Sequence, residues 1–128
     1  MKSQLTSLEI SCLVKEFKVL INSKVEKIFQ TGKKEFYILF HIANTGKKIL
    51  RVTDKLIYLT GKKPVMEEPP GFCMFLRKNL DNSRLRGISQ KEPERIIEFL
   101  FETKEGLKKL IAELFGGGNL LILDNEDI

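Results

Sequence analysis

Four basic side chains near the middle of the chain have the types and spacing of a phosphate-binding cluster. Arg77, Lys78, Arg84 and Arg86 occur within one short stretch. A guanidinium group presents its N–H donors in a planar fork that matches phosphate oxygens, so the pattern favours contacts with a nucleic-acid backbone. The same cations would also complement the dipole at the C-terminal end of a helix, which is the structural alternative.

Residues suited to nucleophilic, acid–base or metal chemistry form no comparable set. His41, the only histidine, lies in an apolar stretch that predicts a strand, and Cys12 and Cys73 lack C-x-x-C spacing. One histidine and two separated cysteines do not predict a zinc site and are typical of a reduced protein. Gly116–Gly118 precede a strand-like segment without a G-K-[ST] motif, which favours a hairpin turn over a phosphate cradle. The sequence therefore predicts no catalytic residue, no cofactor and no metal.

The composition predicts one domain with an uneven charge. The 128 residues are 42% hydrophobic and carry a net charge of 22 − 17 = +5. Residues 1–63 carry 13 basic and 5 acidic groups, whereas residues 64–128 carry 9 and 12. A basic first half indicates an anionic partner, of which nucleic acid is the commonest, or else a solubilising surface. The apolar runs are too short for a membrane span and no secretory signal is visible, so we expect a cytoplasmic protein without membrane contact.

The N-terminal segment predicts an amphipathic helix over residues 5–22. Thr6 and Glu9 have the T-x-x-E spacing of a capping box, in which each side chain accepts a hydrogen bond from a main-chain N–H of the first turn. Asn22 is suited to end the helix. The apolar stripe recurs at helical spacing and comprises Ile10, Leu13, Val14, Phe17, Leu20 and Ile21.

Short aromatic and β-branched segments, separated by turn residues, fill the remainder of the first half. The tetrapeptide T-G-K-K begins at Thr31, Thr45 and Thr60, and its glycine and lysines suit exposed turns. This regular spacing predicts a β-meander rather than a duplicated domain, with the second and third lysine pairs at one end of the sheet. The predicted strands are 25–30, 35–42, 49–53 and 56–60.

The second half predicts a proline-rich crossover loop over 64–71, followed by a helix over Gly71–Leu80 that Asp81–Ser83 terminate. The buried side of this helix is expected to comprise Phe72, Phe75, Leu76 and Leu80, with Cys73 and Met74 adjoining. The predicted strands are 85–90, 95–101, 107–115 and 119–123. We therefore expect an α+β protein, an antiparallel β-sandwich or barrel of about eight strands flanked by two helices.

Four segments of the sequence carry a resemblance to a known family. They read L-T-S-L-E-I-S-C-L-V-K-E, P-P-G-F-C-M-F-L-R-K-N-L, R-L-R-G-I-S-Q-K-E-P-E-R-I-I-E-F and E-L-F-G-G-G-N-L-L-I-L-D, in order from residue 5 to residue 124. These segments resemble the NFACT-N domain of the RqcH and NEMF ribosome quality-control family, whose older name is fibronectin-binding protein A. The resemblance implies that residues 1–128 are a partial NFACT-N domain, the N-terminal fragment of a longer multidomain protein.

The resemblance also implies a fold and a function. The fold would be similar to the N-terminal β-sandwich of formamidopyrimidine-DNA glycosylases. The function would be that of a non-enzymatic RNA-binding adaptor. Its partners would be tRNA and the large ribosomal subunit obstructed by peptidyl-tRNA, and it would support C-terminal tailing of the stalled nascent chain.

Two family positions implicated in tRNA engagement fall on this sequence. The acidic residue of the first helix falls on Glu9, and the Asp-Arg pair at a strand start falls on Glu94 and Arg95. Both acidic positions carry Glu, which is one methylene longer than the usual Asp. Arg95 matches directly. Together with Arg77, Lys78, Arg84 and Arg86, these residues form the expected RNA-binding set.

Two other functions remain as alternatives. A glycosylase-like nucleic-acid enzyme would need an N-terminal proline amine, whereas position 2 is Lys2. A fibronectin-binding adhesin, as the older family name suggests, would need an export signal that the sequence does not show. The oligomeric state is left open by the sequence.

Overall fold

Two segments of the chain, each a helix followed by four strands, build the fold. The computed structural model describes residues 6–32, 34–62, 64, 71–91, 95–114 and 119–123. The first segment comprises α1 (Ser7–Glu16), the 3-10 helix η1 (Phe17–Leu20), β1 (Lys24–Gly32), β2 (Glu35–Ile42), β3 (Gly46–Val52) and β4 (Ile57–Thr60). The second comprises α2 (Gly71–Leu80), β5 (Arg84–Lys91), β6 (Ile96–Thr103), β7 (Gly106–Glu113) and β8 (Asn119–Leu123). All eight predicted strands and both predicted helices are therefore confirmed, with bounds shifted by a few residues.

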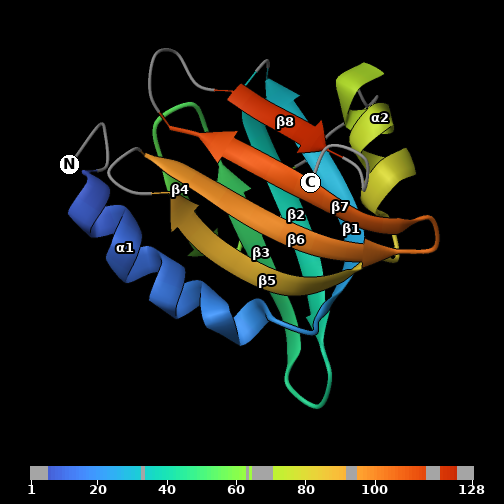
Figure 1. The fold of residues 1–128 in the computed structure, drawn as a ribbon. Coiled ribbons are helices and arrows are strands. Elements are labelled where there is room, and N and C mark those ends of the chain that lie inside the picture. The colour runs from blue at the N-terminus through green and yellow to red at the C-terminus, as the bar shows by residue number, and fades with distance from the viewer. Residues whose placement is uncertain are drawn as a thin grey trace.

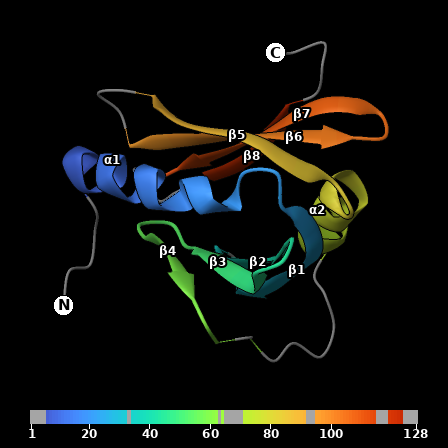
Figure 2. The ribbon, with the colours of Figure 1, turned by 90° about the horizontal axis from the view of Figure 1, so that it is seen from below.

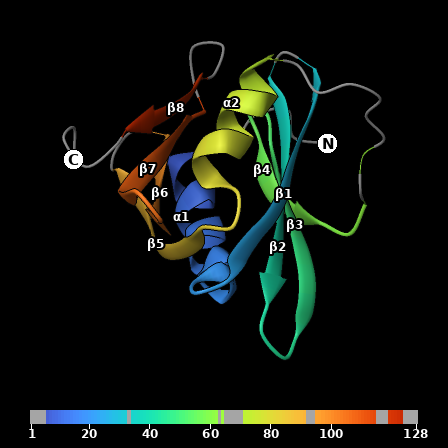
Figure 3. The same cartoon turned by 90° about the vertical axis from the view of Figure 1, so that its right-hand side faces the viewer.

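The eight strands form one antiparallel sheet in the order β4-β3-β2-β1-β5-β6-β7-β8. At its centre, β1 and β5 share a single ladder pair, Lys24 with Arg84. Because the two strands diverge beyond that pair, the halves of the sheet fold into two facing layers (Figures 1 and 2). The two helices fill opposite sides of the space between the layers, with α1 beside β5 and α2 beside β1 (Figures 2 and 3). The α+β architecture expected from the sequence is confirmed.

Apolar side chains from the inward faces of both layers meet in one core. Phe40 of β2 and Phe101 of β6 are fully buried and stack with their ring centroids 6.5 Å apart. Leu50 and Leu110, from β3 and β7, are also fully buried. Alternation along each strand places these residues inward and polar residues outward, as expected for sheets with one buried face.

A repeat of 60 residues relates the two halves. Asn22 and Asn82 both have a left-handed backbone, with φ of 73° and 65°, and Gly46 and Gly106 have φ of 119° and 111°. In the pairing of β1 with β2, the register shifts two residues after the first paired residue of β1. The pairing of β5 with β6 shifts at the equivalent place. The T-G-K-K tetrapeptides lie within the first half alone, so their spacing could not reveal this repeat.

The first helix begins as expected and ends earlier than expected. The Thr6 N–H donates to Glu9 Oε1 at 3.0 Å and the Glu9 N–H donates to Thr6 Oγ1 at 3.1 Å, which confirms the capping box. The predicted continuous helix over 5–22 is wrong at its C-terminal end. There the chain tightens into η1, which buries Phe17 and Leu20, before Asn22 turns it toward β1.

The second helix has the predicted bounds and a different buried face. Cys73, Leu76 and Leu80 are buried, whereas Phe72 and Phe75 are 37% and 49% exposed. These three buried residues lie at i, i+3 and i+7, so they form one stripe along the helix. The small side chain of Cys73 allows this stripe to pack close to β1. The prediction that both phenylalanines face the core is therefore wrong. Met74, expected to adjoin that buried side, is exposed, and Phe72 packs edge-on against Phe36 and stacks on Phe75.

The lysines of the second T-G-K-K belong to a strand rather than a turn. Gly46 supplies the positive φ, and Lys47 and Lys48 continue into β3 with exposed side chains. Thr60, the last residue of β4, lies opposite Ile49 in the first half of β3. The described part of the third tetrapeptide, residues 60–62, therefore lies at the same end of the sheet as the second tetrapeptide, as expected. The proposed turn at Gly116–Gly118 and most of the crossover loop lie outside the described residues.

Candidate nucleic-acid interface

The junction of β1 and β5 brings two of the predicted arginines onto one turn. The Arg84 Nη1 donates to the main-chain oxygen of Asn22 at 3.1 Å, and the Arg86 Nη1 donates to Asn22 Oδ1 at 2.8 Å. Lys24 faces Arg84 across the ladder. All three cationic side chains are exposed. We call Lys24, Arg84 and Arg86, together with Asn22, the seam cluster.

One carboxylate adjoins the seam cluster. Glu102 of β6 lies opposite Arg84 in the ladder, and its Oε1 accepts a hydrogen bond from Arg86 Nε at 3.0 Å. Three cations and one carboxylate leave a local charge of 3 − 1 = +2. Like charges on directly opposed residues destabilise a strand pair, so Lys24 facing Arg84 carries a cost that a bound anion would relieve.

Arg77 has a structural role at the edge of β1. Its Nε donates to the main-chain oxygen of Ile28 at 2.7 Å, and Cys73 Sγ lies 3.4 Å from the same oxygen. The guanidinium also lies 6.0 Å from the centre of the Phe29 ring. Because β1 and β5 diverge beyond Lys24, the rest of this edge of β1 is not paired with β5, and α2 packs against it instead. Arg77 therefore lies apart from Arg84 and Arg86, and the predicted basic cluster is divided.

Lys78 lines a cavity of about 160 Å³ between the end of α2 and the turn joining β6 to β7. Lys104 lies on the same cavity wall, and so do two carboxylates, Asp81 and Glu105. Burial raises the pKa of Asp81, against the opposing influence of nearby cations. The mixed charge makes this cavity a weaker anion site than the seam cluster.

Glu9 and Arg95 lie at the other end of the molecule from the start of β5. The beginnings of α1 and β6 share one end in both views (Figures 1 and 2). The carboxylate of Glu9 binds the Thr6 N–H, and the main-chain oxygen of Arg95 accepts a hydrogen bond from the Leu114 N–H at 2.8 Å. The length of β5, roughly 24 Å for eight residues, separates this end from the seam cluster. Glu94 lies outside the described residues.

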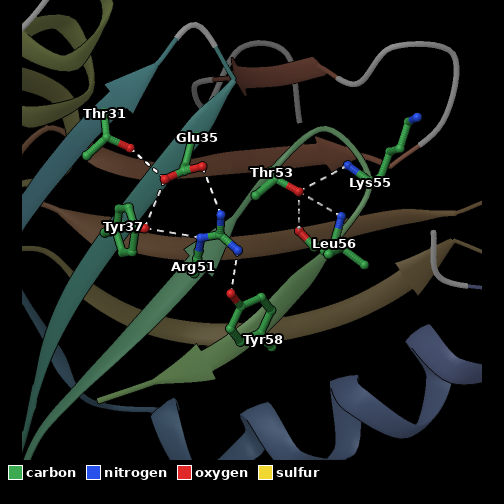
Figure 4. Close-up of polar contacts among 8 residues, drawn as sticks. All are labelled: Thr31, Glu35, Tyr37, Arg51, Thr53, Lys55, Leu56 and Tyr58. Carbon is green, nitrogen blue, oxygen red and sulfur yellow. Dashed lines mark hydrogen bonds and ion pairs between the residues drawn. The ribbon is translucent and has the colours of Figure 1, made fainter. Parts of the chain in front are cut away.

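A second charged cluster lies across β2, β3 and β4 (Figure 4). The Arg51 Nη2 lies 2.8 Å from Glu35 Oε2, its Nε donates to Tyr37 Oη at 3.1 Å, and its Nη1 donates to Tyr58 Oη. The guanidinium lies 5.8 Å and 5.3 Å from the centres of these two tyrosine rings. Its charge and most of its donors are satisfied internally, so this cluster braces three strands rather than offering a binding surface.

The same network shifts the titration of its members. A hydrogen bond from Thr31 is the largest influence that lowers the pKa of Glu35, and bonds from Tyr37 and Arg51 add to it against the effect of burial. Burial raises the pKa of Tyr37. The pKa of Arg51 is also raised, because its bonds to Glu35 and the tyrosines outweigh the effect of burial.

Within the described residues, no group of three or more His, Cys, Asp or Glu side chains is arranged to hold a metal ion. The described helices are also too short to cross a bilayer.

Sequence reasoning missed Asn22 and Lys24 as partners of the arginines. The sequence predicts Asn22 as the end of the first helix, whereas α1 ends at Glu16 and η1 ends at Leu20. The contacts of the Asn22 turn come from residues more than 60 positions away. The signal that could have found them is the repeat L-x-N-S-[KR], which occurs at Leu20–Lys24 and Leu80–Arg84.

The fold and its junction define a two-layer α+β domain with an exposed cationic surface. The family described as NFACT N-terminal and middle domains matches residues 6–128. The chain is 39% identical, over 136 residues, to the archaeal Rqc2 homolog aRqcH of Methanocaldococcus jannaschii, and the match covers 99% of this chain and 20% of that relative. The chain belongs to the NFACT N-terminal family.

Other relatives agree with this membership. The ribosome quality control complex subunit NEMF homolog of Drosophila melanogaster is 32% identical over 98% of this chain and 13% of its own length. The N-terminal domain of fibronectin-binding protein PavA from Streptococcus pneumoniae superposes with a TM-score of 0.84 at 26% identity, covering 93% of this chain and 49% of that one. The chain thus spans a fifth or less of these two curated relatives and about half of the solved domain.

Proposed function

We propose that this chain is an RNA-binding adaptor module of ribosome quality control. It binds tRNA and the large ribosomal subunit obstructed by peptidyl-tRNA, and so supports C-terminal tailing of the stalled nascent chain. The observation that carries this proposal is the seam cluster, where three exposed cations are held together beside one carboxylate. The relatives named as ribosome quality control subunits support the biological setting.

Phosphate recognition follows from the chemistry of the seam cluster. Arginine forks and a lysine contact phosphate oxygens without reading base sequence, which suits a module that engages structured RNA by its backbone. The first half of the chain adds a wider positive potential, since it carries 13 basic and 5 acidic groups. Binding and positioning are the whole role of this module, because the bond-forming step belongs to the ribosome.

A second contact is proposed at the far end of the molecule. Glu9, Glu94 and Arg95 match the family positions implicated in tRNA engagement. Arg95, half-buried just before β6, supplies a cation there. Two contacts at opposite ends of β5 would let one domain hold an extended RNA surface. Arg77 and Lys78, in the last turn of α2, contribute further positive charge.

The test is a titration of fluorescently labelled tRNA with the 128-residue chain at low and moderate salt. Each neutralised phosphate contributes roughly 0.7–0.9 to the slope of log affinity against log salt, so we expect a clear loss of affinity as salt rises. Arg84→Ala together with Arg95→Ala should weaken binding. Lys55→Ala, which removes one exposed cation from the β3–β4 turn, controls for a general loss of surface charge and should have the smaller effect. Salt-insensitive affinity, or affinity unchanged in the double variant, would contradict the proposal.

Fibronectin binding is a second candidate, favoured by the name of the solved relative from Streptococcus pneumoniae. A pull-down that compares immobilised fibronectin with purified ribosomes separates the two functions. Capture by fibronectin and not by ribosomes would favour the adhesin.

The glycosylase alternative has a direct chemical test. Borohydride trapping on abasic DNA detects the covalent adduct of an N-terminal amine. The sequence has Lys2 where those enzymes expose proline, so no adduct is expected. The proposed likeness of this sandwich to the glycosylase N-terminal domain concerns the fold and requires no such chemistry.

A further inference from the structure

We infer that Asn22 is a positioning residue that turns Arg84 and Arg86 into a preorganised clamp for an RNA phosphodiester, with Lys24 as the third cation. The inference rests on the proposed function and names the group that would hold the arginines in place. Asn22 contacts both side chains with different atoms, its main-chain oxygen for Arg84 and its Oδ1 for Arg86. Neither contact was expected from the sequence.

The internal repeat provides a built-in comparison. The Asn22 N–H donates to the oxygen of Leu85 at 2.6 Å, and the Asn82 N–H donates to the oxygen of Val25 at 3.0 Å. Both turns therefore join the two halves of the sheet through the same main-chain bonds. The fold needs the left-handed asparagine twice, once in each half.

Only the first of the two turns carries arginines, among the described residues. The positions equivalent to Arg84 and Arg86 beside Asn82 are Lys24 and Glu26, and Glu26 pairs with Lys47 at 3.1 Å instead. Since the Asn82 turn forms without a guanidinium partner, the fold does not require the arginines at Asn22. Their placement there is an addition to the fold, which points to a binding role.

The clamp keeps donors available for an anion. Arg84 uses one of its five N–H groups on Asn22, and Arg86 uses two, on Asn22 and Glu102. That leaves four on one guanidinium and three on the other, on exposed side chains whose positions are fixed by these bonds. Fixing a side chain before binding reduces the entropy lost when the ligand arrives. Lys24 has no ion pair within the described part of the chain and adds a third charge beside Arg84.

The decisive variant is Asn22→Gly, compared with Asn82→Gly as the matched control. Glycine keeps the left-handed backbone at low cost, so each variant removes a side chain and leaves the turn. Asn22→Gly should weaken tRNA binding by about fivefold, because a hydrogen bond to a charged group is lost, whereas Asn82→Gly should bind as the unmodified chain does. Arg84→Gln together with Arg86→Gln should lower the salt slope by roughly 0.7–0.9, the share of the one phosphodiester that the clamp holds. Thermal melts check that all variants are folded.

The outcomes separate this inference from the proposed function. Salt-dependent tRNA binding that is equally strong in the Asn22→Gly and arginine variants overturns the clamp and leaves the proposed function standing. Absence of salt-dependent tRNA binding by the unmodified chain overturns the proposed function, and the clamp with it. Competition between inorganic phosphate and tRNA is the third test. Displacement of tRNA by millimolar phosphate at constant ionic strength would assign the cluster to a free anion and overturn the RNA assignment, whereas resistance to it supports the clamp.

Discussion

Lys24 of β1 lies directly opposite Arg84 of β5, in the single ladder pair that joins the two halves of the described sheet. Two like charges therefore occupy the point where the layers are connected. A glutamate in place of Lys24 would form an ordinary cross-strand ion pair with Arg84. We expect Lys24→Glu to stabilise the chain by about 0.5 kcal/mol, measured by urea unfolding, while weakening tRNA binding. A loss of stability in this variant would show that the repulsion is negligible.

Arg77 is expected to matter for stability more than its neighbour Lys78. Arg77→Ala removes the bond to the oxygen of the buried Ile28 and leaves that acceptor with the weak thiol donor of Cys73. The free energy of unfolding should fall by about 1–3 kcal/mol, measured by urea denaturation. Lys78→Ala, at an exposed position on the same helix, should change it by less than about 0.5 kcal/mol. Equal effects would refute the bracing role of Arg77.

The capping role of Glu9 can be separated from its charge. Glu9→Gln keeps an oxygen that can accept the Thr6 N–H bond, so the melting temperature should change little. Thr6→Ala removes the partner bond and should cost about 1 kcal/mol. If Glu9 also contacts RNA through its charge, the Gln variant will show altered tRNA binding at unchanged stability. A large loss of stability in Glu9→Gln would mean that its charge serves the fold.

Glu35 should make stability depend on pH in the acid range. The pKa of Glu35 in the folded state lies below the ordinary value of 4.5. Its contribution to the free energy of unfolding is therefore complete above pH 4.5, and it is lost as the pH falls through the folded-state pKa. Glu35→Gln should therefore melt at a lower temperature than the unmodified chain near neutral pH. The difference should shrink in strong acid. Melts that differ by the same amount at every pH would exclude this linkage.

The two cysteines should differ in reactivity toward a thiol reagent. Cys12 is exposed on α1, whereas Cys73 is fully buried and burial raises its pKa. Because the thiolate is the reactive form, Cys12 should react within the mixing time of an Ellman assay and Cys73 only on unfolding. The second equivalent of reacted thiol, from Cys73, should therefore appear only as denaturant unfolds the chain. Two fast equivalents under native conditions would place Cys73 on an accessible surface.

The elements of this fold were largely predictable because their signals are local. The capping box at Thr6 and Glu9 and the bounds of the second helix depend on neighbours within a few residues. The face that α2 buries was not predictable, because Phe72 and Phe75 are as apolar as the residues that do face the core. Only the approach to β1, which requires a small side chain at Cys73, decides between them.

The candidate site was predictable in its residue types and not in its assembly. The sequence indicated arginines suited to phosphate, and the structure separates Arg77 from Arg84 and Arg86 because α2 must cover the edge of β1. Asn22 joins the site through contacts spanning 62 and 64 residues, which no local pattern encodes. The pairing of β1 with β5 is likewise long-range and could be inferred only from the repeated L-x-N-S-[KR] motif.

The crossed arrangement of the helices has a consequence for synthesis of the protein. The helix of the first half contacts β5, and the helix of the second half contacts β1. A nascent chain that has emerged only as far as β4 still lacks the strand against which its own helix must rest. Its apolar inner face would stay accessible to chaperones until β5 leaves the exit tunnel, so the domain should acquire its structure in one late, cooperative step.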